Sequence, residues 1–287
     1  MLEADEVSSI FRKYESEKDE FKREFPFEIK KLEDSINKKL LKDFTGERTG
    51  FLQVGKHKWF FPSEFKKQAA EFYNFEVRSS DVWIVTFPRS GTTLTQEMVW
   101  LLANNLDYRK AAQIPLTVRY PFLEFSCFIH PETKSEFLEE NKHSKLHCEL
   151  IEEIAEPICT YLNHLKEKRF IKTHLPLNLL PKNLLTAGCK NLKDTIIKVQ
   201  DFLGTNHSEK EIEILADHLH IDNFRNNSSV NFDILKNLGI LIDGDGGFVR
   251  RGKSGDWKNY FDTDLNKKAD EWIEENLKNT DFRFPSI

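Results

Sequence analysis

The segment at residues 81–104 (DVWIVTFPRSGTTLTQEMVWLLAN) constrains the fold more than any other part of the chain. Residues 82–87 form an apolar run rich in β-branched and aromatic side chains, which predicts a buried strand. Pro88 ends this run and Gly91 permits a tight turn, after which apolar residues recur at helical spacing. The segment therefore predicts a strand, a short loop and a helix, which is the unit from which α/β folds are built.

The loop between this strand and helix has the features of an anion site. The helix directs its first backbone N–H groups and its positive end at the loop, and Arg89 adds a full charge. Thr92 and Thr93 are candidate N-caps of the helix. The loop lacks the Gly-Lys-Ser/Thr ending of a Walker A motif, which argues against an ordinary nucleoside triphosphatase or a nucleotide kinase. A strand–helix turn with an incidental arginine fits the same residues, so the loop alone leaves both interpretations open.

Composition narrows the class of protein. The chain has 287 residues, of which 39% are hydrophobic, enough for one α/β domain or two small ones. Its net charge of −5 includes no broad basic excess, which argues against a dedicated nucleic-acid binder. No apolar run has membrane-spanning length, and the N-terminus is acidic, unlike a secretory signal. The four cysteines include no CxxC pair, which predicts free thiols in a reducing compartment; the expected location is the cytoplasm.

A second candidate strand ends in polar side chains. Residues 169–174 (RFIKTH) predict a short strand. Ligands of open α/β sheets bind at the carboxyl ends of strands, where this segment places Lys172, Thr173 and His174. A lone histidine is more often structural than catalytic, so its position alone does not assign a role to His174.

Two further stretches are unusual in composition. Residues 244–255 hold five of the twelve glycines together with Arg250, Arg251 and Lys253. A glycine-rich backbone lets a ligand approach closely and three cations would attract an anion, although a flexible basic loop fits the same spacing. Residues 119–131 (RYPFLEFSCFIHP) contain an aromatic cluster interrupted by prolines, which from composition alone predicts a wedge in the core.

The loop sequence TFPRSGTT, at residues 86–93, resembles the loop of cytosolic sulfotransferases that grips the 5′-phosphosulfate end of PAPS (3′-phosphoadenosine 5′-phosphosulfate). Further motifs resemble the same family and follow its order: FLQVGKHKWFF (51–61), RFIKTHLP (169–176), LKDTIIKVQDFLG (192–204) and FVRRGKSGDWKNYF (248–261). The resemblance covers most of the chain beyond about residue 45, and it is greatest to the insect-type branch that includes retinol dehydratase.

The resemblance implies a fold and a domain organisation. The expected fold class is α/β, with a P-loop-NTPase-like parallel sheet flanked by helices. Residues 46–287 would form the sulfotransferase domain. Residues 1–45 would be a charged N-terminal extension, either as one or two surface helices or as a partly ordered arm.

The resemblance also implies roles for individual residues. His174 would be the catalytic base, because imidazole, with a pKa of about 6.5, can take the proton of an acceptor hydroxyl at neutral pH. Lys172 and Arg89 would stabilise negative charge on the transferring sulfuryl group. The residues expected to bind PAPS are Arg89, Ser90, Gly91, Thr92, Thr93, Leu94, Arg250, Arg251 and Gly252.

The implied acceptor is a small, mostly apolar molecule with a hydroxyl group. The residues expected to bind it are Phe122, Phe125 and Thr173. No metal, nucleic acid or membrane is implied as a partner. The segment FDTDLNKKAD, at residues 261–270, departs from the family's dimerisation motif, so a dimer by that route is not expected.

One central block of the family is absent. In the family, the equivalent of residues 187–190 leads into a central strand that ends in an Arg-Asn-Pro-Lys/Arg-Asp motif, and the next helix carries a serine. That arginine and serine hold the 3′-phosphate of PAPS. Here Lys190 is followed directly by Asn191, which predicts a sheet truncated by the loss of central strands and an impaired enzyme. The alternative is a catalytically inactive paralogue or isoform that binds an apolar ligand or a protein partner.

Overall fold

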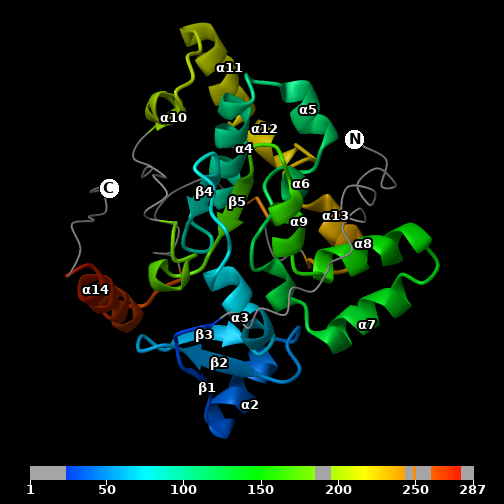
Figure 1. The fold of residues 1–287 in the computed structure, drawn as a ribbon, viewed down its shortest axis with the longest axis vertical. Coiled ribbons are helices and arrows are strands. Elements are labelled where there is room, and N and C mark those ends of the chain that lie inside the picture. The colour runs from blue at the N-terminus through cyan, green and yellow to red at the C-terminus, as the bar shows by residue number, and fades with distance from the viewer. Residues whose placement is uncertain (1–23, 185–194, 243–247, 250–259, 279–287) are drawn as a thin grey trace. The chain divides into compact units, whose positions relative to one another are not determined.

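A computed structural model of the chain describes residues 24–184, 195–242, 248–249 and 260–278 (Figure 1). The chain divides into two compact units, Met1–Phe248 and Val249–Ile287. In the second unit, the structure describes the helix α14 (Thr263–Leu277), which Asp262 caps through a bond from the Leu265 N–H.

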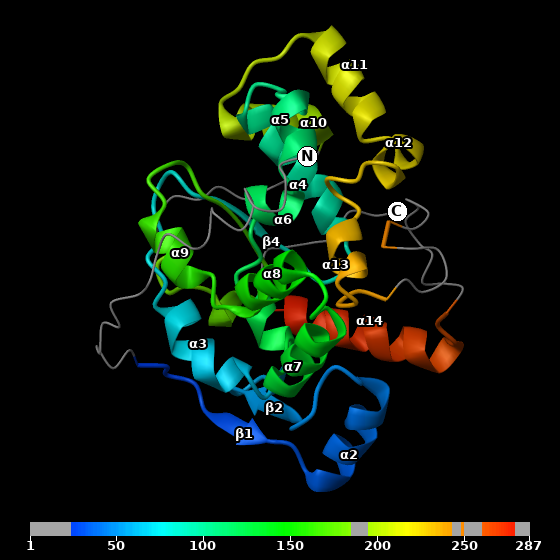
Figure 2. The same cartoon turned by 90° about the vertical axis from the view of Figure 1, so that its right-hand side faces the viewer.

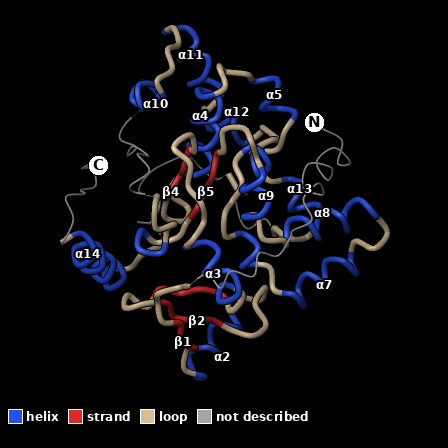
Figure 3. Tube along the Cα trace, in the orientation of Figure 1, coloured by secondary structure: helices blue, strands red, loops and turns tan. Residues whose placement is uncertain are grey.

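The described residues of the first unit form one antiparallel sheet and one parallel strand pair (Figure 3). The strands of the antiparallel sheet are β1 (Ile29–Lys31), β2 (Phe51–Val54) and β3 (Trp59–Pro62), and the parallel strands are β4 (Val82–Val85) and β5 (Phe170–Thr173). The helices of the unit are α2 (Asp34–Asp43), α3 (Phe65–Tyr73), α4 (Thr92–Ala103), α5 (Tyr108–Gln113), α6 (Leu116–Arg119), η1 (Phe125–Phe128), α7 (Pro131–Glu140), α8 (Lys145–Ala155), α9 (Cys159–His164), η2 (Leu177–Leu179), α10 (Thr195–Leu203), α11 (Glu209–His218), α12 (Ile221–Arg225) and α13 (Asp233–Asn237).

The parallel pair β4–β5 forms where the sequence predicts two strands. Its register aligns Val82 with Phe170 and Val85 with Thr173. The segment before η1 continues the pairing on the far side of β5, because Lys172 N donates to Pro121 O and Leu123 N donates to Lys172 O, both at 2.9 Å. Among the residues that the structure describes, no strand pairs with the other edge of β4.

The helix α3 lies between the two sets of strands, and the largest core cluster is built around it (Figure 1). Phe65 and Phe72 of α3 are almost completely buried, together with Phe61 from β3 and Ile171 from β5. The ring of Phe65 stacks on Phe61 with the centroids 4.0 Å apart. Apolar residues at helical spacing thus bury one face of α3 against both sheets.

Part of the range predicted as an N-terminal extension belongs to a sheet. Ile29 in β1 is paired with Val54 in β2, and α2 follows as a surface helix without buried residues. Phe25 and Phe27 pack edge-on against Tyr73 of α3. The sequence indicated the surface helix but gave no sign of a strand, because Ile29 is only partly buried and Lys30 and Lys31 are exposed.

The expected threonine caps of α4 are wrong. Gly91 is the N-cap residue, with a φ of +92°, and Thr92 is the first residue of the helix. Glycine adopts this left-handed conformation without steric penalty, so it ends the loop where a threonine side chain would be strained.

In Figures 1 and 2, α11 lies at the α4–α5 end of the unit, and His218 of α11 bonds to Glu97 of α4 at 3.1 Å.

A buried ion pair fixes the beginnings of β4 and β5. Arg169 donates from Nε and Nη2 to the two carboxylate oxygens of Asp81, at 2.7 and 2.6 Å, and both side chains are fully buried. Its Nη1 and Nη2 also donate to the carbonyl oxygens of Leu162 and Glu76, and its guanidinium lies over the ring of Phe75. Four of the five N–H donors of Arg169 are thus bonded, and the carboxylate of Asp81 balances its buried charge.

We expect Asp81→Asn to lower the free energy of unfolding by about 3–5 kcal/mol, because it leaves the charge of Arg169 buried without its counter-ion. Urea denaturation followed by circular dichroism measures this change. Glu139→Gln is the matched control, because it removes a carboxylate from an exposed pair with Lys142 and should cost no more than about 1 kcal/mol. Equal midpoints for the two variants would contradict a stabilising role for the buried pair.

Candidate functional site

The loop that joins β4 to α4 presents a set of unused backbone donors. Among the described residues, no protein acceptor bonds the N–H groups of Gly91, Thr92, Thr93 or Leu94, whereas Thr95 N donates to Gly91 O. The first N–H groups of a helix have no partner within the helix and direct its positive end outward. A Cβ built on Gly91 would meet nothing within 4 Å, so the loop faces open space at this point. The arrangement suits an anion.

Internal bonds hold this loop in place. Thr86 Oγ1 and Thr92 Oγ1 lie 2.7 Å apart, and Ser90 Oγ donates to Phe87 O at 2.6 Å. Arg89 has a φ of +65° and donates from Nη2 to Phe248 O at 3.1 Å, with its guanidinium over the Phe248 ring. Two hydrogen bonds within the loop and the contact of Arg89 with Phe248 thus fix its conformation.

His174 follows β5 at the same edge as the loop. Its Nδ1 lies 2.8 Å from Thr86 O and 3.2 Å from Thr86 Oγ1. A carbonyl oxygen can only accept, so Nδ1 carries the proton and Nε2 is left with its lone pair. Burial lowers the pKa of His174 to about 4; the bond to Thr86 raises this pKa and the nearby Lys172 lowers it. The ring is neutral at pH 7 and can accept a proton at Nε2.

Lys172 provides a cation beside this histidine. Its Nζ lies 4.2 Å from the centroid of the Phe122 ring. Burial lowers the pKa of Lys172 to about 8, the charge of Glu124 raises this pKa, and Arg89 lowers it. Arg89 and Lys172 are therefore close enough to affect each other. The structure brings Arg89, Lys172 and His174 to one edge of the parallel pair, as the sequence predicted.

Glu124 is part of the site, although the sequence analysis missed it. Only 1% of this residue is exposed. Its Oε1 accepts the backbone N–H of His174 at 2.7 Å, and its Oε2 accepts the hydroxyl of Thr173 at 2.8 Å. Burial raises the pKa of Glu124 to about 7, against the lowering effect of these bonds and of Lys172. The signal available in the sequence was a single acidic residue inside the aromatic run at residues 119–131.

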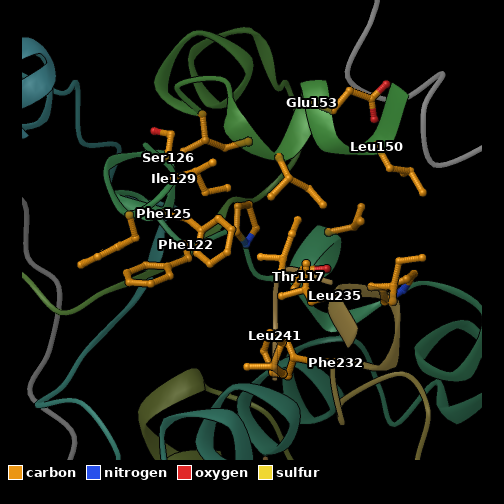
Figure 4. A pocket seen from close by; sticks show the side chains of 18 of the residues that line it. Thr117, Phe122, Phe125, Ser126, Ile129, Leu150, Glu153, Phe232, Leu235 and Leu241 are labelled. Carbon is orange, nitrogen blue, oxygen red and sulfur yellow. The ribbon is translucent and has the colours of Figure 1, made fainter. Parts of the chain in front are cut away.

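An apolar cavity of about 630 Å³ lies beside these residues (Figure 4). Phe122 and Phe125 lie on one side of it and Leu150 on the other. Lys172 reaches the cavity, and the ring of Phe122 also contacts that of His174, with 5.0 Å between the centroids. The remaining walls come from segments distant in the sequence, including Phe232, Ile234, Leu235, Ile240, Leu241 and Phe248.

The other predicted site residues either do not line the cavity or lie outside the described residues. Thr173 is fully buried and bonds Glu124, and it does not line the cavity. Leu94 is 41% exposed on the first turn of α4. Arg250, Arg251 and Gly252 lie outside the described residues, as does the junction of Lys190 and Asn191.

No group of three or more His, Cys, Asp and Glu side chains in the described ranges is arranged to hold a metal ion. None of the helices described is both long enough and apolar enough to cross a membrane.

Comparison with known proteins identifies the family of this chain. The family model described as "Sulfotransferase domain" matches residues 79–192 and 189–281, which together make up most of the chain. This chain belongs to the sulfotransferase family. The resemblance to cytosolic sulfotransferases that the motifs indicated is confirmed, and with it the assignment to an enzyme family that transfers sulfuryl groups. Luciferin sulfotransferase of Photinus pyralis is 25% identical over 337 residues, a match that covers 88% of this chain and 88% of that protein.

Solved structures of retinol dehydratase resemble this sulfotransferase in fold. A complex with androsterone and the inactive cofactor PAP has a TM-score of 0.78 and 28% identity, and the match covers 92% of this chain and 99% of the other. A complex with retinol and PAP has a TM-score of 0.77 and 29% identity, covering 91% and 99%. The predicted α/β fold with a parallel sheet flanked by helices is confirmed by this likeness.

The matches are interrupted inside the chain. The family model matches in two stretches that meet at residues 189–192. The match to the Photinus pyralis enzyme extends over 337 positions, whereas this sulfotransferase has 287 residues. The relative therefore has residues without a counterpart here.

We expect nuclear magnetic resonance of the ¹⁵N-labelled imidazole to show His174 as the neutral Nδ1–H form at pH 7. The bond to Thr86 O selects this tautomer, and burial should keep the ring neutral until the pH falls toward about 4. The His174→Ala protein identifies the signals. An Nε2–H tautomer, or a titration midpoint near the ordinary value of about 6.5, would contradict the geometry described.

Proposed function

We propose that this sulfotransferase transfers a sulfuryl group from PAPS to the hydroxyl of a small, mostly apolar acceptor, with His174 as the base. The observation that carries the proposal is the position of His174. Its Nδ1–H donates to Thr86 O, and its ring contacts the cavity residue Phe122. The ammonium of Lys172 contacts the same phenylalanine ring. A proton acceptor, a cation and an apolar cavity thus meet at the edge where the anion loop begins.

PAPS supplies an activated sulfuryl group, and the bond between its sulfur and the bridging oxygen of the 5′-phosphate breaks as the acceptor oxygen bonds to that sulfur. Nε2 of His174 takes the proton of the acceptor hydroxyl, so the ring becomes a cation as the oxygen becomes a nucleophile. Lys172 and Arg89 stabilise the negative charge that gathers on the leaving phosphate. A bound anion also raises the pKa of His174 from about 4, which makes the imidazole a stronger base in the loaded site.

The loop residues suit the 5′ end of PAPS. The N–H groups of Gly91, Thr92, Thr93 and Leu94 can donate to phosphate oxygens, and the guanidinium of Arg89 adds a positive charge. We assign the 3′-phosphate to Arg250, Arg251 and Gly252 on the family motif alone. The PAP present in the two retinol dehydratase complexes supports PAPS as the donor.

The cavity supports the acceptor class. Its lining is mainly aromatic and aliphatic, with Phe122 and Phe125 on the side nearest His174. The androsterone and retinol named in the retinol dehydratase complexes are mostly apolar molecules with a hydroxyl group. Thr173, expected to touch the acceptor, supports the site through its bond to Glu124 instead.

We further propose that the activity is impaired, because a central block is missing after Lys190. The two-part family match, the extra positions in the relative and the unpaired edge of β4 among the described residues all support this. The 3′-phosphate would lose contacts to an arginine and a serine, which are worth about 1.5–3 kcal/mol each when one partner is charged. The loss of both corresponds to roughly two to four powers of ten in affinity for PAPS.

The same missing block favours a second candidate function. A chain that retains the apolar cavity but has lost part of its nucleotide site can bind an apolar ligand, or a protein partner, without turnover. The affinity for the nucleotide separates the two functions, because the inactive binder would hold apolar ligands equally well with or without PAP.

We expect titration calorimetry to show weak but measurable binding of adenosine 3′,5′-bisphosphate, and Arg250→Ala/Arg251→Ala to abolish it. Two charge-assisted contacts to the 3′-phosphate would be lost in this variant. Lys267→Ala/Lys268→Ala is the matched control, because it also removes two positive charges, both from exposed pairs on α14. Equal affinities of the two double variants would remove Arg250 and Arg251 from the site.

We expect only feeble transfer of sulfate from PAPS to phenols, sterols and retinoids by the chain as it stands. A family-type insert after Lys190 should restore turnover, and His174→Ala should abolish it in the restored chain, because the hydroxyl proton then has no acceptor. His164→Ala, which changes an exposed histidine of α9, is the control.

The outcomes of this assay separate the proposals. Robust turnover by the unmodified chain, lost in His174→Ala, would contradict the impairment but support the transferase. No turnover even with the insert would contradict the transferase and leave the ligand-binding function.

A further inference from the structure

We propose that Glu124 is a positioning residue of the transfer site, which holds the end of β5 through two hydrogen bonds and provides a counter-charge to Lys172. The catalytic meaning of this inference rests on the proposed sulfuryl transfer, but the contacts themselves do not. Glu124 is not adjacent to the cavity and has no role in the proton transfer described above.

The hydrogen bonds of Glu124 fix two consecutive residues. Oε1 accepts the backbone N–H of His174, and Oε2 accepts the hydroxyl of Thr173, whose oxygen in turn accepts the N–H of Leu175 at 3.0 Å. The chain from Thr173 to Leu175 is thereby tied to one carboxylate at the point where the strand ends. His174 is then held from both sides, by Glu124 at its backbone and by Thr86 at its ring.

The strand pairing places Glu124 beside Thr173 and His174. Lys172 N donates to Pro121 O and Leu123 N donates to Lys172 O, so the glutamate that follows Leu123 reaches Thr173 and His174. The same register brings Phe122 beside Lys172, whose ammonium lies over the Phe122 ring and is influenced by the charge of Glu124. One short segment therefore provides both the cover and the counter-charge of Lys172.

The charge of Glu124 has a defined effect on Lys172. The largest influence on the pKa of Lys172 is burial, which lowers it; Glu124 opposes this and Arg89 adds to it. Without the carboxylate, both remaining influences favour the neutral amine. A neutral Lys172 could not stabilise charge on a leaving phosphate.

The other titratable groups around Glu124 are few. Lys172 and His174 face it from β5 and from the residue after it, and Arg89 acts on Lys172 from the loop. Cys127 of η1 lies near it as well, and the pKa of that thiol is raised by burial and then by the charge of Glu124. Neither His174 nor Cys127 carries charge at pH 7, so Lys172 is the one full opposite charge that acts on Glu124 among the described residues.

Two substitutions separate the two parts of the role. Glu124→Gln keeps the length of the side chain, so its carbonyl can accept from His174 and its amide can donate to Thr173, but the charge is gone. Glu124→Asp keeps the charge, but its shorter side chain cannot span to both partners. Glu47→Gln is the matched control: Glu47 is also buried and also accepts backbone N–H groups, from Arg48, Thr49 and Gly50, in a different part of the unit.

The experiment is a pH titration by nuclear magnetic resonance of the full chain, labelled at the lysine ammonium and the histidine imidazole. In Glu124→Gln, the midpoint of Lys172 should move to lower pH by about one unit, with the His174 ring signals unchanged. In Glu124→Asp, the Lys172 midpoint should stay within about 0.3 unit of the wild type, while the His174 signals should shift or broaden. Glu47→Gln should change neither.

A measurement on the wild-type protein keeps the proposal testable should a Glu124 variant not fold. The backbone N–H of His174 should report the titration of its acceptor, with a midpoint at about pH 7, where burial places the pKa of Glu124. An unchanged Lys172 midpoint in Glu124→Gln, or a His174 amide that does not titrate near pH 7, would overturn the proposal.

Transfer kinetics tests the inference separately from the proposed function. In a chain with restored activity, Glu124→Gln should lower kcat at high pH, where Lys172 loses its proton, with little change in the KM of the acceptor. If no chain shows transfer or nucleotide binding, the proposed function fails, but the resonance titration still decides whether Glu124 positions His174 and charges Lys172.

Discussion

The position of every polar group in the site depends on the register of one parallel strand pair. Because side chains alternate along a strand, the alignment of Val85 with Thr173 decides which residues of β5 face the cavity and which face inward. A slip by one residue would turn the Lys172 side chain away from the cavity and the Thr173 hydroxyl toward it. The ion pair of Asp81 with Arg169 prevents this slip, because it joins the residues that precede the two strands.

A second consequence of this pairing is that charged groups gather where water is excluded. Glu124 is buried and Lys172 is partly buried, and this burial raises the pKa of the carboxyl and lowers that of the ammonium. Such perturbed groups are a common feature of functional sites, although structural ion pairs produce them as well. Here the perturbed groups adjoin an apolar cavity and a loop with unused donors, which favours the functional interpretation.

The sequence predicted the local units of this site well and its assembly less well. The strand–loop–helix at residues 81–104 and the polar end of β5 could be predicted because each depends on a short periodic pattern. Glu124 was missed because its partners are a backbone N–H and a hydroxyl about fifty residues away, which no local pattern records. The same holds for Phe232 and Leu241, which close the cavity from the other end of the unit. The caps of α4 were misjudged because the left-handed turn at Gly91 replaces a side-chain cap by backbone geometry.

The backbone of Arg89 is strained, and this strain bears on the proposed anion role of the loop. A residue with a side chain is strained at a φ of +65°, whereas glycine is not, and asparagine is less so. A loop shaped by stability alone would favour glycine at position 89, since that replacement relieves strain without removing any core contact. An arginine there keeps the strain and provides a positive charge, which is what the proposed anion site requires. Variation among natural homologues at this one residue would then record whether a lineage still uses the anion: drift toward glycine marks a loop that has lost its ligand.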